Sequence, residues 1–560
     1  MNFPSPCSTL MTTSPTPGER LRAPVEDGGI VSVPSVHRAR LVAESNAAAL
    51  NSTGITIAER SLGEMRVWTR AECVTRSLQW MRQTLGLSPR LPEGLLYVTG
   101  HQPSLNHPGV WMKNVAVAHL ARCSGTTGLN LIVDNDIAGP PVIRVPAGTR
   151  ETPRFEPIEY DAPSPTQPWE ERQLQSKEVF DTFADRVAEA LQPWKITPSL
   201  TECWPDAIAA QFRTRQMSSL LTACRVSDER RWNISNLELP VSEMCQTEPF
   251  LAFAQHLIQN HECFFTAYNA AVHWYRRHYH IRNHRHPMPD LEQQNNRLEL
   301  PFWYWEPGET DRHRVFASRG KDEINLYAGE EHIASLPAQG CDVTRLQELQ
   351  KRGRFRTRAL TTTLFARLCL SDLFVHGIGG AKYDEITDRM IQNFFGFTPP
   401  GFLTLTATIR LPLDPFPVTS QDLATLRTTI RKLQIDGPCG ETTPELTALQ
   451  QSQIQLIAEA RRQREEELSR RERRALRGAN RQRYLQLKQN QQELERLAGE
   501  QIEETESLLA RKTAQHQANG ILKSREFPTC LFPHEVLQPV VNRLRSEVCS
   551  GRSVESGMHV

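Results

Sequence analysis

The sequence lacks the features that mark several specialised classes of protein. It has no run near the roughly eighteen apolar residues that a membrane-spanning helix needs, so it predicts no membrane partner. Its 12 cysteines lie far apart and never form a Cys-x-x-Cys pair, which argues against a zinc ribbon. Its net charge of +1 over 560 residues provides no overall field to attract nucleic acid or an anionic membrane.

The first residues also lack the continuous apolar stretch of a secretory signal, because Pro, Ser and Thr recur throughout residues 1–20. We therefore expect a cytoplasmic protein whose thiols are mostly reduced. A similar composition continues without periodicity to residue 38, so residues 1–38 are predicted to form a disordered arm. Over the whole chain, 39% hydrophobic and 23% charged residues indicate a globular protein of two or three packed units.

A strand, loop, helix and strand follow one another between residues 95 and 136. The short apolar run Leu95–Thr99 ends in Gly100-His101-Gln102-Pro103, and helical spacing resumes from Val110 to Ala121. A second run, Leu129–Val133, closes on Asp134-Asn135-Asp136. This order is typical of a βαβ unit in a parallel sheet, where ligands bind at the carboxyl ends of the strands. Both polar clusters fall at such ends.

A related pattern recurs late in the chain. Leu373–Val375 is a short apolar run, His376-Gly377-Ile378-Gly379-Gly380 is a glycine-rich turn, and a helix is predicted over Tyr383–Phe395. Residues 402–409 then form a strand with many β-branched residues. We expect an α/β protein with a Rossmann-type parallel sheet built from residues 39–170 and 351–440, joined by a mixed helical insertion at residues 171–350.

The composition changes to Gln, Glu, Arg and Leu between residues 444 and 512, with almost no Gly or Pro, which predicts long helices. Leu487 and Leu494 lie seven apart, and Gly478 offers a reversal between two arms. We predict an antiparallel coiled-coil hairpin over residues 441–515 that also forms a homodimer contact, followed by a tail at residues 516–560.

These features, in this order, resemble the cysteine ligase family of bacillithiol biosynthesis, BshC, over nearly all of residues 60–520. The resemblance rests on the turn Thr99-Gly100-His101-Gln102, and on residues 358–375 followed by Gly379, Gly380 and Tyr383. It implies a Rossmann-type core akin to nucleotidylyltransferases, connecting insertions and a coiled coil that mediates dimerisation. The chain is a divergent example, since residues 134–137 lack a histidine and the family's Gly-Pro-Gly-Glu turn is replaced at residues 377–382.

The resemblance implies a carbon-nitrogen ligase that joins the carboxyl group of cysteine to an amino-sugar conjugate such as glucosaminyl malate. Such a reaction needs an activated carboxyl group, so we expect ATP or another nucleotide, with Mg²⁺, as cofactor. Two alternatives stay open: nucleotidyl transfer on the same core, and a non-catalytic coiled-coil dimer that binds a nucleotide or a thiol.

Backbone N-H groups at a glycine-rich turn that opens a helix suit an anion. The turn at Gly100 and the turn at Gly377 could each supply such a site, although glycine is also common in purely structural turns. We expect His101 and Gln102 to contact the activated carboxyl group or a phosphate. The residues expected to bind substrate or phosphate are Thr99, Gly100, His107, Lys113, Gly377, Gly379, Gly380, Lys382 and Tyr383.

Asp134 and Asp136 close the second strand, where a carboxylate could orient an amine substrate, bind a ribose hydroxyl or hold Mg²⁺. Capping of a helix or turn explains these residues equally well. We expect no resident metal site in the histidine-rich residues 273–286, because the arginines among them would repel a cation.

Two further segments have a simple structural interpretation. The aromatic residues 298–305 could stack on a base, but a buried strand is the simpler account. Residues 461–474 carry seven arginines and four glutamates, which could contact RNA. Mixed charge favours instead a solvated helix with i,i+4 ion pairs, so we expect no nucleic-acid partner.

Overall fold

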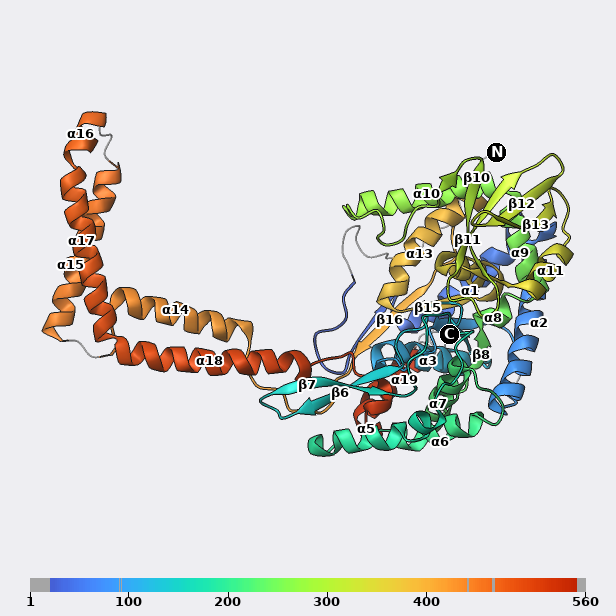
Figure 1. Ribbon diagram of the computed structural model, residues 1–560, viewed down its shortest axis with the longest axis horizontal. Coiled ribbons are helices and arrows are strands. Elements are labelled where there is room, and N and C mark those ends of the chain that lie inside the picture. The colour runs from blue at the N-terminus through green and yellow to red at the C-terminus, as the bar shows by residue number, and fades with distance from the viewer. Residues whose placement is uncertain (1–20, 90, 92, 441–442, 466–468, 551–560) are drawn as a thin grey trace, which may run out of the picture. The chain divides into compact units, whose positions relative to one another are not determined.

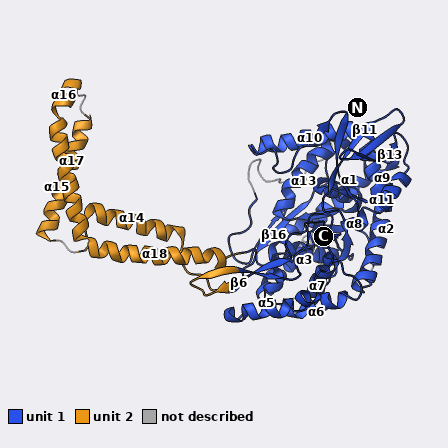
Figure 2. Ribbon diagram, in the orientation of Figure 1, with its two compact units in different colours: residues 1–145, 156–412, 525–560 blue, residues 146–155, 413–524 orange. Residues whose placement is uncertain are grey.

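The computed structural model describes residues 21–89, 91, 93–440, 443–465 and 469–550 (Figure 1). Two compact units make up the chain (Figure 2). Unit 1 contains residues 1–145, 156–412 and 525–560, and unit 2 contains residues 146–155 and 413–524. Across the described residues, no helix combines the length and the apolar character needed to cross a membrane.

A six-stranded sheet lies at the centre of unit 1, in the order β1-β16-β15-β4-β5-β8. Its strands are β1 (Gly29–Val33), β4 (Tyr97–His101), β5 (Leu129–Ile132), β8 (Leu237–Pro240), β15 (Leu373–His376) and β16 (Leu403–Thr408). All neighbours pair in parallel except β1, which runs antiparallel to β16 at one edge. Numbered along the chain, the five parallel strands have the spatial order 3-2-1-4-5, which reverses direction between β4 and β15. The expected α/β class is confirmed.

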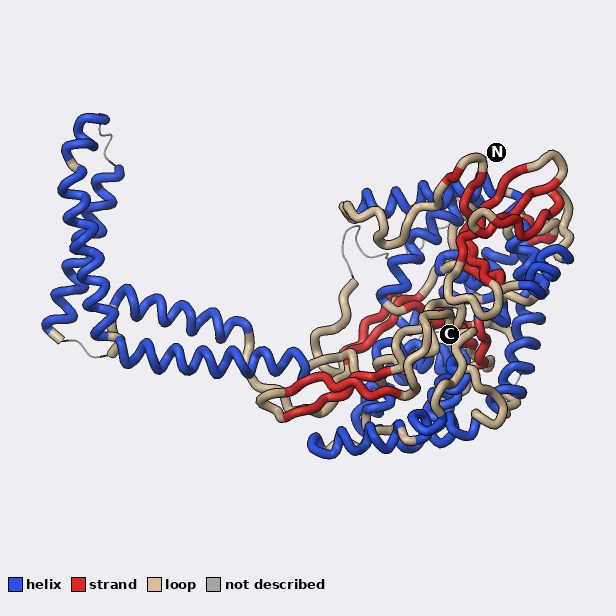
Figure 3. Tube along the Cα trace, in the orientation of Figure 1, coloured by secondary structure: helices blue, strands red, loops and turns tan. Residues whose placement is uncertain are grey.

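Helices surround this sheet (Figures 1 and 3). Those of unit 1 are α1 (Ala39–Ser52), α2 (Leu62–Trp80), α3 (Pro108–Cys123), α4 (Lys177–Asp181), α5 (Phe183–Leu191), α6 (Leu200–Ala210), α7 (Met217–Arg231), α8 (Val241–Met244), α9 (Glu248–Gln259), α10 (His261–His278), α11 (Thr344–Arg352), α12 (Ala359–Phe365), α13 (Ile378–Met390) and α19 (His534–Ser550). One π-helical turn extends α2, α12 and α13, at Met81–Leu85, Ala366–Leu370 and Ile391–Phe395.

A second, antiparallel sheet falls mostly within the predicted insertion. Its path is β13-β12-β11-β10-β14, formed by β10 (Arg297–Trp305), β11 (His313–Arg319), β12 (Glu323–Ala328), β13 (Glu331–Pro337) and β14 (Arg354–Thr357), with β9 (Gln293–Gln294) beside β10. The aromatic segment is therefore a strand, as predicted, and Leu300, Phe302 and Trp305 are buried. Short strand pairs are also formed by β2 (Thr56–Ile57) with β3 (Arg60–Ser61), and by β6 (Val142–Gly148) with β7 (Pro153–Glu159).

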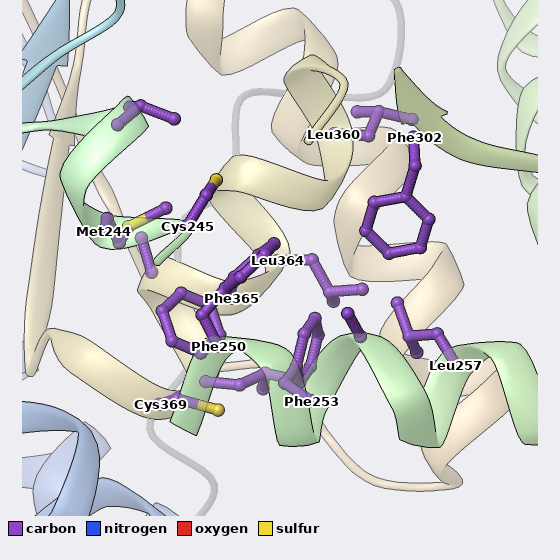
Figure 4. Close-up of a cluster of buried hydrophobic side chains, with 14 of the residues drawn as sticks. Met244, Cys245, Phe250, Phe253, Leu257, Phe302, Leu360, Leu364, Phe365 and Cys369 are labelled. Carbon is purple, nitrogen blue, oxygen red and sulfur yellow. The ribbon is translucent and has the colours of Figure 1, made fainter. Parts of the chain in front are cut away.

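One hydrophobic core connects the elements of unit 1. Figure 4 shows its centre, where Phe250 and Phe253 of α9 pack on Phe365 of α12, with ring centroids 5.4 and 5.2 Å from Phe365. The same core continues to Val98 of β4 and Phe302 of β10. Both sheets therefore share one apolar interior.

Two boundaries differ from the sequence-based prediction. Residues 29–33 of the predicted arm form β1, whose short apolar sequence pairs with β16 and covers the edge of the sheet. Residues 1–20 of that arm lie outside the described residues. In addition, β8 comes from the segment that was predicted to be an insertion, so the sheet is not built from residues 39–170 and 351–440 alone.

The described residues of unit 2 are mainly helical. Its helices are α14 (Ser420–Asp436), α15 (Pro444–Glu465), α16 (Arg470–Ala475), α17 (Arg477–Leu497) and α18 (Gly499–Leu522). The helices α15 and α17 run antiparallel, since Asn490 bonds to Ser452 while Arg483 bonds to Gln463. The helices α14 and α18 form a second pair (Figures 1 and 3).

The coiled coil predicted for unit 2 stays a prediction. Leu494 and Ala498 are buried, whereas Tyr484 is 64% exposed. The helix pair does not reverse at Gly478, however, because this residue lies inside α17. The predicted tail contains the end of α18 and the well-formed helix α19.

A buried carboxylate fixes the start of β15 against β4. Asp372 accepts hydrogen bonds from Arg66 and Arg70 of α2, each at 2.6 Å, and from the backbone N-H of Leu96 at 2.7 Å. Burial lowers the pKa of Arg66 to about 10, but this guanidinium remains charged at neutral pH. Asp372 thus ties α2 to the first residues of both central strands.

We expect Asp372→Ala to lower the free energy of unfolding of unit 1 by about 3–5 kcal/mol, because it leaves a buried guanidinium group without its partner. Urea unfolding followed by tryptophan fluorescence measures this change, since all 10 tryptophans belong to unit 1. The exposed Asp322→Ala is the matched control and should change stability by less than about 0.5 kcal/mol. Equal effects of the two variants would contradict the role of Asp372.

Candidate functional site

The two predicted glycine-containing segments lie side by side, but the first is not a turn that opens a helix: Gly100 and His101 belong to β4 and pair with β5, and α3 begins only at Pro108. In the register of β4 and β15, Thr99 faces Val375, so Gly100 and His376 follow at the same level of the sheet. This is the place where the strand order reverses, and ligands of open α/β sheets bind at such a crevice. The structure therefore brings together two segments that are about 280 residues apart in the sequence.

A buried lysine lies between these segments. Lys113 of α3 is 3% exposed, and its Nζ donates a hydrogen bond to the backbone oxygen of Gly100 at 2.8 Å. Its Cδ would lie 3.9 Å from a Cβ atom added to Gly377. Burial lowers the pKa of Lys113 to about 8, and no ion pair within the described residues compensates its charge. A mostly protonated ammonium group therefore stands at the crevice without an anionic partner.

The second turn leaves the beginning of α13 uncovered. Gly377 is the N-cap residue, and no side chain caps the first N-H groups of this helix. A Cβ atom on Gly379 would meet nothing within 4 Å, and neither Gly377 nor Gly379 has a positive φ. Backbone strain and crowding therefore do not require these two glycines. They leave space in which a ligand could approach the helix N-terminus.

Gly380 is different, because a Cβ atom there would lie 2.7 Å from Nδ1 of His376. His376 is buried at the end of β15, stacks on Phe374 at 4.3 Å and pairs through Nε2 with Asp384 of α13. The requirement for glycine at position 380 is therefore steric.

A charged network below the turn was not predicted from the sequence. Asp384 is fully buried and contacts Arg367, with 3.2 Å between the charged atoms, as well as His376. Burial alone would raise the pKa of Asp384, but the positive charges of His376 and Arg367 hold it below its usual value. The network ties α13 to β15 and so holds the glycine-rich turn in place. In the sequence, the only sign of this network is that Asp384 follows His376 by eight residues.

His101 and Gln102 line a small cavity of about 50 Å³ beside β4 and α3. Burial, and then the charge of Lys113, lower the pKa of His101 to about 3, so its imidazole is neutral at physiological pH. Gln102 donates a hydrogen bond to Asp136 at 2.5 Å. The remaining lining includes Ser104, Asn106, Trp111, Asn130, Cys203, Cys224, Arg225 and Cys530.

Two predicted binding residues have structural contacts. Thr99 is fully buried, and its hydroxyl donates to the backbone oxygen of Val375 at 2.8 Å, which links β4 to β15. His107 is the N-cap of α3 and accepts a hydrogen bond from the N-H of Gly109 at 3.1 Å. Because Nδ1 of His107 accepts this bond, its Nε2 is the nitrogen left for other contacts, and it lies 3.7 Å from Glu526. The role of His107 in phosphate binding stays a prediction.

Asp134 and Asp136 have separate environments. Asp134 is buried and accepts hydrogen bonds from the N-H and hydroxyl groups of Ser242, at the start of α8. Burial raises the pKa of Asp134 to about 7, and the nearby charge of Glu170 adds to this effect. The predicted capping alternative thus applies to Asp134. Asp134 also lines a polar cavity of about 290 Å³, together with Glu170, Glu171, Gln216, Ser218, Ser219, Glu243, Arg354 and Arg356.

Asp136 points to a more open region, with 44% of its side chain exposed. Arg312, which precedes β11, contacts its carboxylate at 3.3 Å and donates to the backbone oxygen of Asn135 at 2.8 Å. Sequence reasoning missed Arg312 because it comes from the second sheet, far along the chain. At the carboxyl end of β5, the negative charge of Asp136 is therefore paired with the positive charge of an arginine that lies just before β11 of the second sheet.

The last two predicted residues lie on α13. Tyr383 packs against the hydrophobic core, and Lys382 is half-buried. The predicted roles of both residues in binding stay predictions. In the histidine-rich segment, His273 contacts Asp290 at 3.1 Å. Within the residues that the structure describes, no three His, Cys, Asp or Glu side chains form a group that could hold a metal ion.

The sequence matches no protein-family model, and no curated protein matches it. The resemblance to the cysteine ligase family therefore stays a prediction.

The three glycines of the turn provide a matched test of this geometry. Gly379→Ala should leave the melting temperature unchanged or raise it, because Ala favours a helix by about 1 kcal/mol and nothing obstructs its Cβ atom. Gly380→Ala should lower it by several degrees, since the new atom collides with His376. Differential scanning calorimetry of both variants checks this, and an equal response would contradict the assigned crowding.

Asp134 should make stability depend on pH. Its pKa is about 7 in the folded protein and close to 3.8 when unfolded, so the folded state retains a proton that the unfolded state loses. Its contribution to stability therefore falls as the pH rises from about 4 to 7 and is constant above that range. The Asp134→Asn variant should not show this decrease in the free energy of unfolding, which is on the order of 2–4 kcal/mol. Urea unfolding at pH 4.5, 6 and 7.5 measures it, and a parallel pH profile in the variant would contradict the assignment.

Proposed function

We propose that this chain is an enzyme that joins an amino-acid carboxyl group, that of cysteine, to the amine of an amino-sugar conjugate. The proposal combines the resemblance to the cysteine ligases with the site at the edge of the parallel sheet. The spatial strand order 3-2-1-4-5 supports a Rossmann-type core, in which the crevice between β4 and β15 is the expected ligand site.

The observation that carries the proposal is the uncompensated ammonium group of Lys113. Burying a charge without a partner is costly, and a bound anion would offset that cost. The N-H groups at the start of α13 add a second anion-attracting element, and Gly377 and Gly379 leave room beside them. A phosphate of the activating nucleotide, or the phosphate that leaves an activated carboxyl group, has the required charge and size.

The reaction then follows ordinary acyl transfer. The amine nitrogen attacks the carbonyl carbon of the activated cysteine, a C-N bond forms, and the bond to the phosphate oxygen breaks. The phosphate departs with the electron pair, and Lys113 with the α13 N-terminus would stabilise its negative charge. The proton lost by the amine goes to solvent.

The neutral His101 and Gln102 would contact the acyl group from the adjacent cavity. Their hydrogen-bonding groups can orient a carbonyl oxygen without adding charge. For the amine, the polar cavity beside β5 and β8 offers Asp134 together with other carboxylates and hydroxyl groups. Mg²⁺ would arrive with the nucleotide phosphates, and Asp136 is the exposed carboxylate on this edge that could contact it.

Nucleotidyl transfer is the second candidate, because an anion site at the reversal point of such a sheet also suits a nucleoside triphosphate. It is distinguished from ligation by the release of pyrophosphate from ATP when cysteine is absent. The expected homodimer is supported by Ile454 and Leu485 of unit 2, which are 67% and 48% exposed. The mass of the assembly in solution tests that contact.

The first experiment incubates the protein with cysteine, glucosaminyl malate and ATP, with and without Mg²⁺, and detects the cysteinyl conjugate by mass spectrometry. Lys113→Met should reduce turnover at least about 100-fold, because it removes the charge that stabilises the leaving phosphate. The exposed Lys321→Met is the matched control and should retain full activity.

Binding of pyrophosphate, measured by calorimetry, separates binding from turnover. Its affinity should fall as the pH rises through about 8, because Lys113 loses its proton there. Lys113→Met should abolish this affinity while keeping or raising the melting temperature, since a buried uncompensated charge is removed. A folded wild-type protein that forms no conjugate and binds no pyrophosphate would overturn the proposal.

A further inference from the structure

Unit 2 carries a concentration of positive charge that the proposed function does not use. Residues 461–488 contain eleven arginines and lysines against four glutamates, a net charge of +7, whereas the whole chain has +1. This segment covers the end of α15, all of α16 and the first half of α17 (Figure 1). The positive charge is therefore local to one end of the α15 and α17 pair.

Few ion pairs are formed along these helices by the described arginines of residues 461–488. Arg483 contacts Glu459 at 3.6 Å across the helix pair, and Glu472 caps α16 through Ser469. Within residues 443–465 and 469–550, no ion pair holds the exposed side chains of Arg461, Arg462, Arg464, Arg470, Arg471, Arg474, Arg477 and Arg481. Their guanidinium groups are available to an external anion.

Four exposed residues of α17 form a stripe along one face of the helix. Arg477, Arg481, Tyr484 and Lys488 follow one another at spacings of four, three and four residues, so they share one face of the helix. Tyr484 is 64% exposed, which is unusual for an aromatic side chain. The stripe extends about 16 Å along the helix, at about 1.5 Å per residue.

A hollow between the two arms lies beside this stripe. Its lining combines cationic, amide and aromatic groups, and consists of Ala460, Gln463, Arg464, Arg473, Leu476, Asn480, Arg483, Tyr484 and Leu487. Guanidinium groups bind phosphates through paired hydrogen bonds, and an exposed tyrosine ring can stack on a base. Together, the hollow and the stripe offer guanidinium groups that can bind phosphates and a tyrosine ring that can stack on a base.

We propose that this surface, formed by residues 461–465 and 469–488, binds single-stranded nucleic acid through its phosphates and stacks one base on Tyr484. The complementary charge supports a polyphosphate backbone as the partner. An anionic membrane is a poorer match, because α16 has the sequence RRERRA and offers no large apolar side chain for insertion. Single strands are favoured over duplexes, since only unpaired bases expose a face for stacking.

The test uses the full chain and measures fluorescence anisotropy of labelled 12-nucleotide oligo(U), oligo(dT) and a 12-base-pair duplex. We expect dissociation constants on the order of micromolar for the single strands at 50 mM salt, and weaker binding to the duplex. The logarithm of the binding constant should fall linearly with the logarithm of the salt concentration. Comparison of oligo(U) with oligo(dT) distinguishes RNA from DNA as the natural source of the ligand.

The decisive variant is Arg477→Glu with Arg481→Glu and Lys488→Glu. It should weaken binding at least tenfold and reduce the salt slope by about 2, because about 0.7 counterions are released per contacted phosphate of a single strand. The control is Arg427→Glu with Arg431→Glu and Lys432→Glu on α14, which makes the same change of charge on exposed residues of the same unit. The control should stay within about twofold of the wild type.

Tyr484→Ala should weaken binding about tenfold without changing the salt slope, and Tyr484→Phe should restore it, because stacking needs the ring and not the hydroxyl group. Circular dichroism at 222 nm shows whether each variant keeps its helices. Equal losses in the two triple variants, no binding at 50 mM salt, or binding to phosphatidylserine vesicles without binding to oligonucleotides would each overturn the proposal. Because these residues lie in unit 2 and Lys113 in unit 1, this outcome is independent of the ligase assay.

Discussion

The arrangement of unit 1 depends on the carboxylate of Asp372. This side chain accepts hydrogen bonds from two arginines of α2 and from the backbone N-H of Leu96, so it sets where β15 begins relative to β4. Since the two strands pair in parallel from their first residues, their ends also coincide. The interaction at one end of the sheet therefore places Gly100 and the turn at Gly377 side by side at the other end.

Positive charge is used differently in the two units. In unit 1 a single ammonium group, Lys113, is buried beside an uncapped helix N-terminus, where weak screening makes its attraction for one small anion strong. In unit 2 many exposed arginines each interact weakly in water but together suit an extended polyanion. The first arrangement favours selective binding of a phosphate group, and the second favours contact with many phosphates in any sequence.

Much of the parallel sheet could be predicted because its strands are short apolar runs that end in glycine or aspartate. The strands β4, β5, β15 and β16 are local patterns of this kind. The strand β1 was missed because its pairing partner, β16, lies about 375 residues away and its own five residues carry little signal. The hydrogen bond from Thr99 to Val375 could not be predicted for a similar reason, since Val375 is distant in the sequence.

The sequence by itself determined the α/β class, the glycine-rich turn at Gly377 and the change to long helices after residue 444, because these depend on local periodicity and composition. Only the tertiary structure decided which charges are compensated. It buried Lys113 without an anionic partner, joined His376 to Asp384 and Arg367, and brought Arg312 from the second sheet to Asp136. Desolvation and ion pairing act through space, so no local pattern could have indicated them.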